Sequence, residues 1–413
     1  MNKAIQTLID RGFYKNCTDL EKLSDLMDQE KVKAYVGIDP TGPSVHIGHT
    51  LPLYAMHHLQ NNGHSPIILI GGGTAMIGDP SGKTEMRKML SLETILDNAG
   101  RLKKQISSII DFSENPGVGL GRAYLRNNAD WLVGAKYIEF LREVGVYFKV
   151  NEMLRLESVK QRMERQDGIT FLEFSYQLLQ AYDFYMLNKT EGARLEVGGD
   201  DQWGNIVAGI DLTRKMNGPE CYGLTFNLIT RADGKKMGKS EKGAIFLDPT
   251  MCSPYDYYQY WRNTNDADVI KFMKLFTFLD LDEIAGYDNP NVNINEAKMK
   301  LAYEQTKLIH GEEEAQKAVS AAKAAFGGGT DRSSMPTTTV ELGEGKNIID
   351  LFFEVGLGGA TKSEVRRLIQ GGGCFIDDVK ITDLKAIITS DTAKNGEMIL
   401  RAGKKNMKRV LVK

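Results

Sequence analysis

The sequence predicts an α/β fold, in which a Rossmann-like domain with a parallel sheet is followed by a helical domain and a small α+β domain. Strand-like apolar runs alternate with helical patterns through the first half, and the clearest run, Pro66–Ile70, leads directly into Gly71–Gly73. This order of strand, glycine loop and helix is typical of parallel sheets that bind ligands at their strand ends. After Tyr255 the pattern turns helical, and a glycine-rich segment after Phe326 separates a last short domain.

Composition limits the classes of protein to be considered. With 413 residues, of which 42% are hydrophobic and 26% charged, the chain matches an ordinary globular protein of two or three domains. The formal net charge of −2 gives no general attraction to a polyanion, so any nucleic-acid contact requires a local basic patch. No apolar run approaches the ~18 residues of a membrane span. The start, Met1–Gln6, lacks the features of an export signal.

The cysteines are scattered singly along the chain, at Cys17, Cys221, Cys252 and Cys374. Because none forms a C-x-x-C pair, neither a zinc site nor a disulfide framework is indicated. A reducing cytoplasm is the simplest setting for such a protein.

The elements of the first half follow from its apolar runs. Residues 32–38 and 66–70 form predicted strands, and the chain from 141 to 188 is mostly helical by its pattern. A second sheet-like portion runs from 194 to 247. We expect a first domain over residues 1–250, with a helical insertion at about 90–195.

The second half begins with two helical stretches rich in Ala, Lys and Glu, at residues 256–278 and 295–325. They predict a helical domain over residues 251–326. The glycine-rich segment and the chain as far as Thr339 have the composition of a flexible linker, which we place at residues 327–345.

A last small domain is expected over residues 346–413. Thr361 and Glu364 form a capping box ahead of a short helix at 365–369, which Gly371–Gly373 ends. Short strands follow at residues 374–376 and near 398–400.

The end of the chain is basic, with no acidic residue after Arg401. Its charged residues are Arg401, Lys404, Lys405, Lys408, Arg409 and Lys413. Such an end is either a solvated tail or, on a small folded domain, a surface that contacts phosphates.

Five of the six histidines lie between His46 and His64. A single histidine is usually a hydrogen-bonded structural residue, and no H-E-x-x-H pattern or carboxylate cluster supports a metal site. His46-Ile47-Gly48-His49, however, follows the tight loop Asp39–Gly42 that comes after a strand. A helix then begins, so its N-terminal amides and the two imidazoles converge where phosphates can bind. This arrangement suits charge stabilisation on a polyphosphate without proton transfer.

A second short segment, Lys236-Met237-Gly238-Lys239-Ser240, places two ammonium groups three residues apart. Its glycine lets the backbone bend. Alone, each of the two segments is a weak signal.

Two other glycine-containing segments fail as nucleotide motifs. Residues 78–84 resemble a P-loop, but the loop requires glycine at the position of Ile77. Gly71–Gly73 lacks the third glycine of a dinucleotide fingerprint, because position 76 is Met76. Lys83 and Arg87 are either solvated surface charges or functional residues.

Residues 171–187 form the best predicted helix of the chain. At ~100° per residue, Tyr176, Gln180 and Asp183 fall within about 40° of one another, opposite the large apolar side chains. A polar stripe is usually a solvated face. This one contains a phenol, an amide and a carboxylate but no Lys or Arg, which fits a specific polar pocket better.

The segment Val197–Asn205 combines a glycine turn with Asp200 and Asp201. A turn that merely caps a helix explains these residues. A ribose site also requires a carboxylate, and glycine to admit the sugar closely, and the segment offers both.

The two signature segments together are similar to those of class I aminoacyl-tRNA synthetases. The chain as a whole resembles the bacterial-type tyrosyl-tRNA synthetase family over nearly its full length, more loosely in the linker and last domain. The strongest matches are residues 35–49, 71–83, 171–184, 198–205 and 236–240.

The resemblance implies a two-step reaction. Tyrosine attacks the α-phosphate of ATP to give tyrosyl-adenylate and pyrophosphate, and the tyrosyl group then moves to the 3′-terminal adenosine of tRNA(Tyr). Mg²⁺ is expected to arrive with ATP, with no protein-bound metal or organic cofactor. The resemblance also implies a cytoplasmic homodimer, formed through the insertion around residues 131–151, with no membrane association. The helical domain is expected on the anticodon side, followed by a ribosomal-protein-type RNA-binding domain.

The resemblance assigns roles to individual residues. Tyr35 and Asp183 would hydrogen-bond the substrate phenol. The remaining tyrosine-binding residues would be Asp79, Tyr176 and Gln180 at the ammonium group, and Gln202 at the carboxylate. Asp39 and Asp201 would lie by the ammonium group and the ribose, and the ATP-binding set would be Asp39, Gly48, Gly199, Asp201 and Lys239. The residues stabilising the β- and γ-phosphates would be Thr41, His46, His49, Lys236, Lys239 and Ser240.

Four positions depart from, or vary within, the family pattern. Val36 and Pro52 are expected near the nucleotide. Glu196 replaces a Gln, and Asp200 replaces a Ser; we expect neither to touch an assigned donor or acceptor. An additional acid beside the ribose loop would alter ATP affinity.

Two rival functions are considered. The related tryptophan enzymes are disfavoured by Tyr35 and Asp183, because an indole offers only one donor. A non-catalytic RNA-binding protein of this fold is disfavoured by the intact signature segments. Discrimination against phenylalanine would leave polar groups unpaired in a dry pocket, for which this family is a standard illustration.

Overall fold

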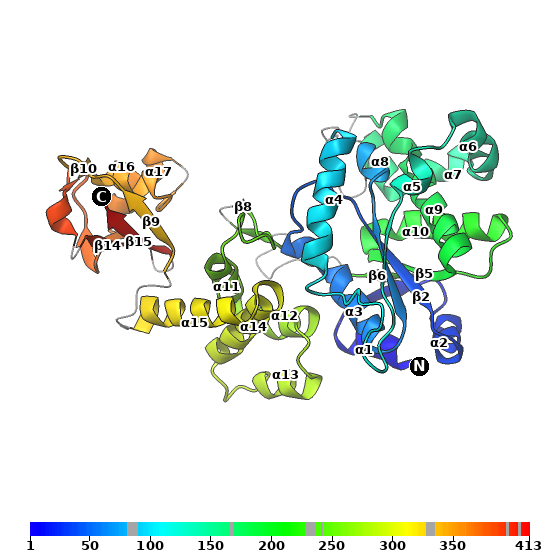
Figure 1. The fold of residues 1–413 in the computed structure, drawn as a ribbon, viewed down its shortest axis with the longest axis horizontal. Coiled ribbons are helices and arrows are strands. Elements are labelled where there is room, and N and C mark those ends of the chain that lie inside the picture. Colours follow the sequence, from blue (N-terminus) through cyan, green and yellow to red (C-terminus); the bar gives the residue numbers. More distant parts are fainter. Residues whose placement is uncertain are drawn as a thin grey trace. The chain divides into compact units, whose positions relative to one another are not determined.

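The computed structural model describes residues 1–80, 90–164, 168–227, 229, 237–240, 243–327, 335–359, 361–393, 396–403 and 406–413. The chain divides into two compact units (Figure 1). The first comprises residues 1–253 and 260–309, and the second comprises residues 254–259 and 310–413.

A six-stranded, mostly parallel sheet forms the centre of the first unit. Its order is β1-β6-β5-β2-β3-β4, and only the edge strand β1 is antiparallel to its neighbour. The strands are β1 (Tyr14–Cys17), β2 (Lys33–Ile38), β3 (Ser65–Ile70), β4 (Tyr124–Asn127), β5 (Ala193–Gly199) and β6 (Tyr222–Phe226). The predicted parallel sheet is confirmed, and with it the strands at residues 32–38 and 66–70.

The chain order of the strands reverses at the centre of this sheet. Helix α3 (Leu51–Asn61) connects β2 to β3 in one direction, whereas α10 (Trp203–Lys215) connects β5 to β6 in the other. Right-handed crossovers therefore place the two helices on opposite faces. In sheets of this type, ligands bind outside the carboxyl ends of the two strands that flank the reversal, which here are β2 and β5.

Helix α9 (Phe171–Glu191) covers one face of the sheet through an apolar cluster. Phe184 and Leu187 of α9 pack with Tyr35 of β2 and Ile67 and Leu69 of β3, all of them buried. Burial of each such side chain contributes roughly 1.5–3 kcal/mol. The packing fixes the height of α9 above the ends of β2 and β5.

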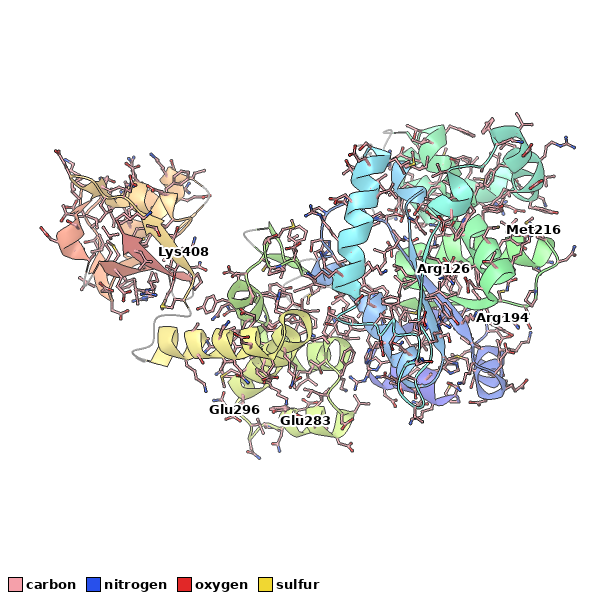
Figure 2. The ribbon with its side chains drawn as sticks, viewed as in Figure 1. Arg126, Arg194, Met216, Glu283, Glu296 and Lys408 are labelled. Atoms are coloured by element: carbon pink, nitrogen blue, oxygen red, sulfur yellow. The ribbon has the colours of Figure 1, made fainter. Side chains whose placement is uncertain are left out.

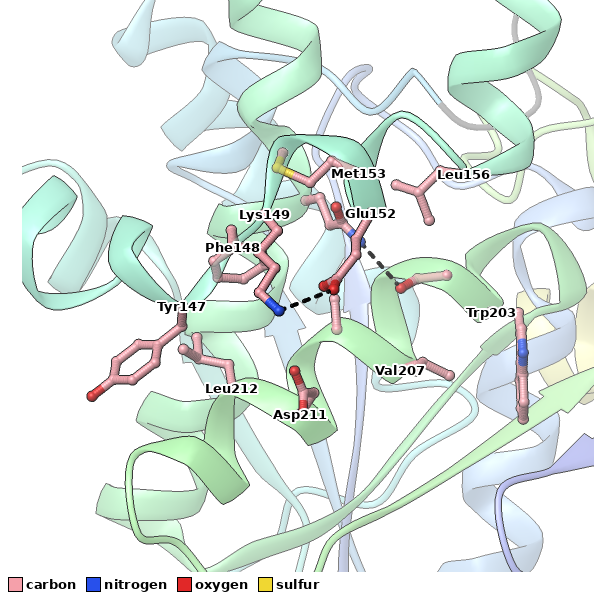
Figure 3. Close-up of a pocket in the computed structure, with 13 residues that line it drawn as sticks. Tyr147, Phe148, Lys149, Glu152, Met153, Leu156, Trp203, Val207, Asp211 and Leu212 are labelled. Carbon is pink, nitrogen blue, oxygen red and sulfur yellow. Dashed lines mark hydrogen bonds and ion pairs between the residues drawn. The ribbon is translucent and has the colours of Figure 1, made fainter.

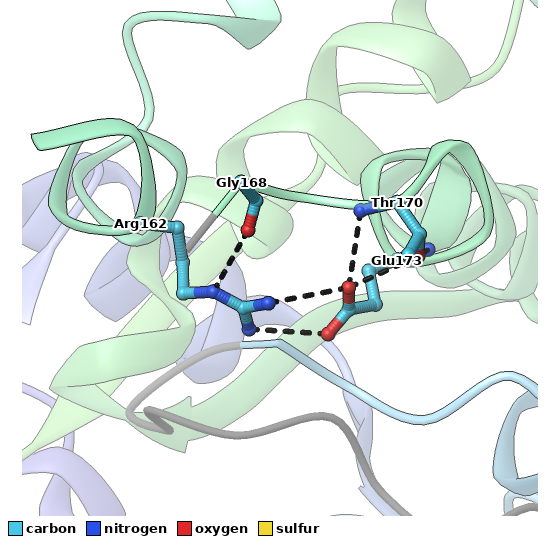
Figure 4. Close-up of polar contacts among 4 residues, drawn as sticks. All are labelled: Arg162, Gly168, Thr170 and Glu173. Atoms are coloured by element: carbon cyan, nitrogen blue, oxygen red, sulfur yellow. Dashed lines mark hydrogen bonds and ion pairs between the residues drawn. The ribbon is translucent and has the colours of Figure 1, made fainter. Parts of the chain in front are cut away.

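The start of α9 is fixed by a buried ion pair and a capping box (Figure 4). Thr170 Oγ1 accepts from the Glu173 N–H, and Glu173 Oε2 accepts from the Thr170 N–H. Arg162 Nη1 donates to Glu173 Oε1 at 3.1 Å and Arg162 Nε to the Gly168 carbonyl at 3.2 Å, so both charges are paired although they are buried.

Most of the insertion between β3 and β5 is helical, and the predicted helical character of residues 141–188 is confirmed. The remaining helices of the first unit are α1 (Lys3–Asp10), α2 (Leu20–Gln29), α4 (Leu92–Ile106), α5 (Ala129–Leu132), α6 (Tyr137–Glu143), α7 (Val150–Met153), α8 (Glu157–Glu164), α12 (Val269–Phe276), α13 (Leu281–Tyr287) and α14 (Ile294–His310). Helix α11 (Pro254–Arg262) belongs to both units.

The predicted sheet-like portion at residues 194–247 was only partly right. It contains β5, β6 and the short pair β7 (Lys239–Ser240) and β8 (Gly243–Ala244), but also the whole of α10. Because the apolar segments of β5 and β6 lie on either side of α10 in the sequence, the helical periodicity of α10 was not recognised.

A five-stranded sheet forms the core of the second unit with two helices. The order is β12-β11-β14-β15-β9, antiparallel except for the parallel pair β15 and β9. The elements of this unit are α15 (Glu312–Gly327), β9 (Thr337–Val340), β10 (Lys346–Asn347), α16 (Ile348–Glu354), α17 (Lys362–Gln370), β11 (Cys374–Ile376), β12 (Val379–Ile381), β13 (Ile387–Ile388), β14 (Glu397–Ala402) and β15 (Asn406–Val412).

The predicted features of this small fold are present, with one correction. The capping box of Thr361 and Glu364 starts α17, and the short strands at 374–376 and near 398–400 are found as β11 and β14. The predicted linker, however, includes β9, which pairs with β15. Its sequence Thr-Thr-Thr-Val is β-branched throughout and favours a strand, although its polar composition suggested a loop.

No helix among the described residues is long and apolar enough to cross a membrane.

Candidate active site

The first signature segment forms a short 3-10 turn between β2 and α3. The turn η1 covers Ile47–His49, and His46 caps it by accepting from the Gly48 N–H through Nδ1 at 3.0 Å. The imidazole rings of His46 and His49 stack, with ring centroids 3.7 Å apart. The two rings and the amides of the turn therefore present one group of hydrogen-bonding atoms at the end of β2.

Backbone pairing holds the second signature segment against the first. Ile47 N–H donates to the Ile245 carbonyl at 3.0 Å, and Ile245 N–H donates to the Gly238 carbonyl at 2.9 Å. A Cβ at Gly48 would lie 2.8 Å from the Met237 carbonyl oxygen. Gly238 has φ +80°, and a Cβ there would lie 2.6 Å from the Gly48 nitrogen. Both positions therefore require glycine.

The structure thus brings the backbones of the two signature segments together. Lys236 lies outside the described residues. Lys239 and Ser240 are described only through their backbone in β7.

The loop that joins β2 to the first signature is held by the insertion helix α4. Asn98 Nδ2 donates to the Pro40 carbonyl at 3.0 Å. Gln105 Oε1 accepts from the Val45 N–H at 2.9 Å, and its Nε2 donates to the Pro43 carbonyl at 3.2 Å. Thr41 lies exposed in this loop. Two amide side chains that the sequence did not single out therefore position the loop that is predicted to bind phosphates.

Asp183 is buried, 3% exposed, and accepts two side-chain hydrogen bonds. Asn128 Nδ2 donates to Asp183 Oδ2 at 2.8 Å, and Trp131 Nε1 donates to Asp183 Oδ1 at 2.7 Å. Neither donor was predicted, because both follow β4 in a segment without a recognisable motif. They fix the carboxylate in place while leaving lone pairs for a further donor.

A second carboxylate, Asp39, joins the same network at the end of β2. Tyr176 Oη donates to Asp39 Oδ2 at 3.2 Å, and Thr74 Oγ1 donates to Asp39 Oδ1 at 2.7 Å. Thr74 also accepts from Asn128 Nδ2 at 3.0 Å. A Cβ at Gly71 would come within 2.0 Å of Asp39 Oδ1, so the glycine after β3 gives the carboxylate its room.

A second group of hydrogen bonds joins amide side chains from α9, the turn after β5 and α10. Asn205 Nδ2 donates to Gln180 Oε1 at 3.0 Å and to Gln202 Oε1 at 3.2 Å. Gln202 Nε2 in turn donates to Asp79 Oδ2 at 2.8 Å. Three predicted site residues, Gln180 of α9, Gln202 of the turn after β5 and Asp79 of the loop after β3, are therefore connected through Asn205 of α10, to which the sequence assigned no role.

The turn after β5 is held in place by hydrogen bonds to neighbouring strands. Gly199 ends β5, and residues 200–202 form the 3-10 turn η4, in which Asp201 is exposed. Asp200 Oδ1 accepts from Asn16 Nδ2 and from Thr225 Oγ1, each at 2.9 Å. Asp200 therefore fastens the turn to β1 and β6.

Glu196 corrects the expectation that this position touches no assigned residue. Its Oε1 accepts from Gln180 Nε2 at 2.9 Å, and its strand position pairs directly with Tyr35 of β2. Burial raises the pKa of Glu196 to about 7, while Gln180 and Tyr35 act in the opposite direction. Burial, followed by Glu196 and Asp183, raises the pKa of Tyr35, which stays a neutral phenol.

Three of the clustered histidines have structural contacts. His57 stacks on Phe278 with centroids 3.7 Å apart, and His64 Nδ1 accepts from the Val32 N–H at 3.2 Å. Burial, with Arg11 nearby, lowers the pKa of His58 to about 3. No group of three or more His, Cys, Asp or Glu residues that could hold a metal ion was found in the described ranges.

Lys83 and Arg87, whose role was left open, lie outside the described residues.

A separate pocket of about 290 Å³ lies away from these polar groups, on the other side of α9 and α10 (Figure 3). It is lined by Tyr147, Phe148, Met153, Trp203, Val207 and Leu212, among others. Lys149 and Glu152 pair across its rim at 3.6 Å. Its other lining residues include Lys149, Glu152, Gln177 and Asp211, none of which is among the predicted site residues.

Comparison with known proteins identifies the family. A family model for class I tRNA synthetases (W and Y) matches residues 27–327, and a model for the tyrosine–tRNA ligase SYY-like C-terminal domain matches residues 330–410. The tyrosine–tRNA ligase of Treponema denticola is 54% identical over 415 residues, covering 100% of both chains. The chain belongs to the tyrosine–tRNA ligase family. The tyrosine–tRNA ligase of Clostridium kluyveri is 50% identical over 417 residues, again with 100% of both chains covered.

A solved structure of the family agrees with the fold. The C-terminally truncated mitochondrial tyrosyl-tRNA synthetase of Aspergillus nidulans superposes with a TM-score of 0.70 and 31% identity, covering 78% of this chain and 94% of that chain. The resemblance inferred from the sequence is therefore confirmed for the tyrosine–tRNA ligase family and its class I fold.

Proposed function

We propose that this member of the tyrosine–tRNA ligase family activates L-tyrosine with ATP and then transfers the tyrosyl group to tRNA(Tyr), using the residues gathered at the ends of β2 and β5. The observation that supports the assignment is the gathering of polar groups at one sheet edge. The hydrogen bonds of Asp183, Asn128 and Thr74 lead to Asp39 at the end of β2, and the chain that follows carries the first signature, whose backbone pairs with the second. In this proposal the amino-acid pocket lies beside these polar groups. An amino acid in the pocket then lies next to a polyphosphate on the signatures.

The phenol of the substrate is recognised at the pocket floor. Asp183 accepts a hydrogen bond from the phenol O–H of the substrate, and Tyr35 donates a hydrogen bond to the phenol oxygen. Asn128 and Trp131 hold Asp183 in the required orientation. Phenylalanine is rejected because it would leave these buried groups without partners.

The ammonium and carboxylate groups of the substrate bind amide, phenol and carboxylate side chains. Asp79, Tyr176 and Gln180 bind the ammonium group, and Gln202 contacts the substrate carboxylate. The hydrogen bonds of Asn205 to Gln180 and Gln202 preset the positions of these side chains. Preset positions reduce the entropy that binding costs.

ATP occupies the edge formed by the signatures and the turn after β5. Asp39, Gly48, Gly199, Asp201 and Lys239 bind the nucleotide. Thr41, His46, His49, Lys236, Lys239 and Ser240 stabilise charge on the β- and γ-phosphates as pyrophosphate leaves. The substrate carboxylate is the nucleophile, so the protein contributes positioning and electrostatics. Mg²⁺ enters as part of the nucleotide substrate.

The chain acts as a cytoplasmic homodimer in this proposal. Exposed apolar residues occur along the insertion, at the start of α9 and on α10, and we call them the insertion face: Val133, Tyr137, Ile138, Val146, Val150, Leu154, Phe171, Leu172 and Val207. One of them, Val207, also lines the pocket of Figure 3. Exposed apolar residues concentrated in one region typically mark an interface, and a second copy would bury the same face symmetrically.

A charge in the insertion face tests the dimer. Val146 is 68% exposed there, and Val118 is fully exposed elsewhere. Val146→Glu is expected to shift the chain to a monomer in analytical ultracentrifugation, whereas Val118→Glu stays dimeric. A dimer that persists in Val146→Glu contradicts this interface.

The second unit supplies the tRNA contact in this proposal. Three basic residues of its end have internal partners: Arg401 stacks on Phe375 at 3.6 Å, Lys408 donates to the Val355 carbonyl at 2.6 Å, and Arg409 pairs with Glu397 (Figure 2 labels Lys408). These partners fix the positive groups on a folded surface, unlike those of a solvated tail. Lys404 and Lys405 lie outside the described residues.

ATP–pyrophosphate exchange tests the amino-acid assignment directly. Exchange is expected with tyrosine and not with tryptophan. Exchange driven by tryptophan alone contradicts the pocket assignment. Tight RNA binding without any adenylate formation would support the non-catalytic alternative.

A further inference from the structure

Two buried polar atoms at the floor of the pocket lack hydrogen-bond partners within the described part of the chain. They are Tyr35 Oη and Glu196 Oε2. The two side chains are 1% and 2% exposed and stand on paired positions of β2 and β5. A buried polar atom without a partner destabilises the folded protein. Two such atoms on facing residues indicate a hydrogen bond whose direction depends on where one proton lies.

We propose that Glu196 is a specificity-determining residue for tyrosine, because its carboxylic acid donates from Oε2 to Tyr35 Oη and leaves the Tyr35 proton for the substrate phenol. This inference rests on the proposed role of Tyr35 in binding the phenol. It adds a protonated carboxyl group to the pocket floor, next to the ionised Asp183.

The direction of the hydrogen bond follows from counting protons. Tyr35 carries one hydroxyl proton. When Glu196 is the acid, it gives its own proton to Tyr35 Oη, and the Tyr35 proton points to the phenol oxygen of the substrate. When Glu196 loses its proton to solvent, the carboxylate takes the Tyr35 proton instead. The substrate phenol then faces only lone pairs at Tyr35, and its binding is weakened.

The surroundings of Glu196 favour the acid. The groups that face it and Tyr35 are Gln180, Asp183 and Tyr176 from α9, Gly209 from α10 and Gly223 from β6. No cation is among these groups, so none of the described residues facing Glu196 compensates a buried negative charge. The pKa of Glu196, raised by burial to about 7, agrees with a group that exchanges its proton near neutral pH.

Hydrogen bonding decides which of the two buried carboxyl groups holds the proton. Burial raises the pKa of Asp183 well above its usual range, while hydrogen bonds from Asn128 and Trp131 act in the opposite direction. Both Asp183 oxygens accept an N–H from these two residues, whereas among the described residues Glu196 accepts an N–H only at Oε1, and its further interaction is with the Tyr35 hydroxyl. Donors stabilise a carboxylate, so the proton rests on Glu196 and Asp183 stays an acceptor.

Glu196→Gln tests the proposal, because its amide offers a donor that cannot ionise. Tyrosine affinity is measured by equilibrium dialysis from about pH 6 to about pH 8.5, on either side of the Glu196 pKa of about 7. We expect the wild-type affinity to fall about tenfold over this range, following the ionised fraction of Glu196. The affinity of Glu196→Gln is expected to change less than about twofold. Glu21→Gln, an exposed glutamate on α2, serves as the matched control and keeps the wild-type profile.

A wild-type affinity that is constant with pH, or a Glu196→Gln affinity that falls with it, overturns the inference. Either result leaves tyrosine binding itself in place, whereas absence of tyrosine binding at every pH would instead overturn the proposed function.

Infrared difference spectroscopy gives a readout that does not depend on substrate. The wild type minus Glu196→Gln spectrum is expected to contain the carbonyl band of a protonated carboxyl group at about pH 6, and to lose it by about pH 8.5, because the Glu196 pKa lies near 7. A spectrum with only carboxylate bands at the lower pH overturns the assignment of the proton.

Discussion

The stacked imidazoles of His46 and His49 are the residues that we propose to stabilise charge on the phosphates. Their ring centroids lie 3.7 Å apart, and His46 also caps the turn that contains His49. If ATP binds there as proposed, these contacts would hold the rings in place beforehand, and the electrostatic stabilisation would require little reorganisation during the reaction.

His49→Ala is expected to slow adenylate formation while leaving tyrosine affinity unchanged. Loss of one donor to a developing phosphate charge typically lowers the rate on the order of 100-fold. Single-turnover adenylate formation and equilibrium tyrosine binding measure the two quantities separately. His57→Ala, which removes a stack on Phe278 outside the site, is the matched control and is expected to lower stability without changing the adenylation rate. A large loss of tyrosine affinity in His49→Ala would refute the phosphate role.

Glu196 also links stability to pH. Its pKa rises from 4.5 to about 7 in the folded protein, so between these values the folded state binds more protons than the unfolded state. The stability that the uncharged acid contributes is complete below about pH 4.5 and is lost as the pH rises through 7.

Glu196→Gln removes this titration. At about 1.4 kcal/mol for each pH unit, the variant is expected to gain about 3 kcal/mol on the wild type between about pH 4.5 and pH 8. Urea unfolding at both pH values, without substrate, measures the change. An equal difference between the two proteins at both pH values would contradict the raised pKa.

The sequence predicted several residues of the candidate site but not the residues that connect them by hydrogen bonds. Tyr176, Gln180 and Asp183 followed from helical spacing. Asn128 and Thr74 carry no motif, and their roles arise only where the ends of β3 and β4 lie side by side. Glu196 was named as a departure, but its contact with Gln180 depends on which way β5 faces, which the sequence left open.

Helix α9 buries both apolar and polar side chains. Phe184 and Leu187 pack on the sheet, and Tyr176 and Asp183 are buried as well, whereas Phe171 at its start is 67% exposed. The first turn therefore gains little from apolar burial, and the buried ion pair and capping box support it instead.

Glu173→Ala is expected to destabilise the first unit by about 3–5 kcal/mol, because it leaves the buried Arg162 charge without a partner. Thermal and urea unfolding measure the loss. Glu139→Ala, which breaks an exposed pair with Lys136, is the matched control and should cost less than about 1 kcal/mol. Similar costs for the two variants would show that the buried pair is not needed.

Among the helices and strands, those that are long or strongly patterned were predicted well from the sequence. The 21-residue α9 and the apolar β3 were clear, because each repeats its pattern several times. Strand β9 was missed, since four β-branched or polar residues beside a glycine-rich segment carry too little pattern to separate strand from loop. Its identity depends on β15, which lies about 70 residues further along.

Across the whole molecule, the parallel sheet and the small C-terminal fold have separate apolar cores. The cluster of the small fold draws only on residues 340–412, and the cluster beneath α9 draws on residues 35–221. Loss of one core therefore leaves the buried contacts of the other in place.

Truncation before Asn347 is expected to leave tyrosine-dependent pyrophosphate exchange unchanged and to weaken tRNA charging about tenfold or more, because basic phosphate contacts are lost. Exchange and aminoacylation assays on the same preparation separate the two steps. Charging that persists at the wild-type rate would refute an RNA-binding role for this region. A loss of exchange would show that the two cores are not independent.

The sheet order also has a consequence for the synthesis of the protein. Strands β2 and β5 are neighbours, yet residues 39–192 lie between them in the chain. The amino-acid pocket proposed at the ends of these strands therefore cannot form in a nascent chain until β5 and α10 have left the ribosome, and pairing across so long an interval is intrinsically slow. Tyrosine bound there would stabilise only the completed sheet. The polypeptide becomes able to recognise its amino acid only after about half of it has been translated.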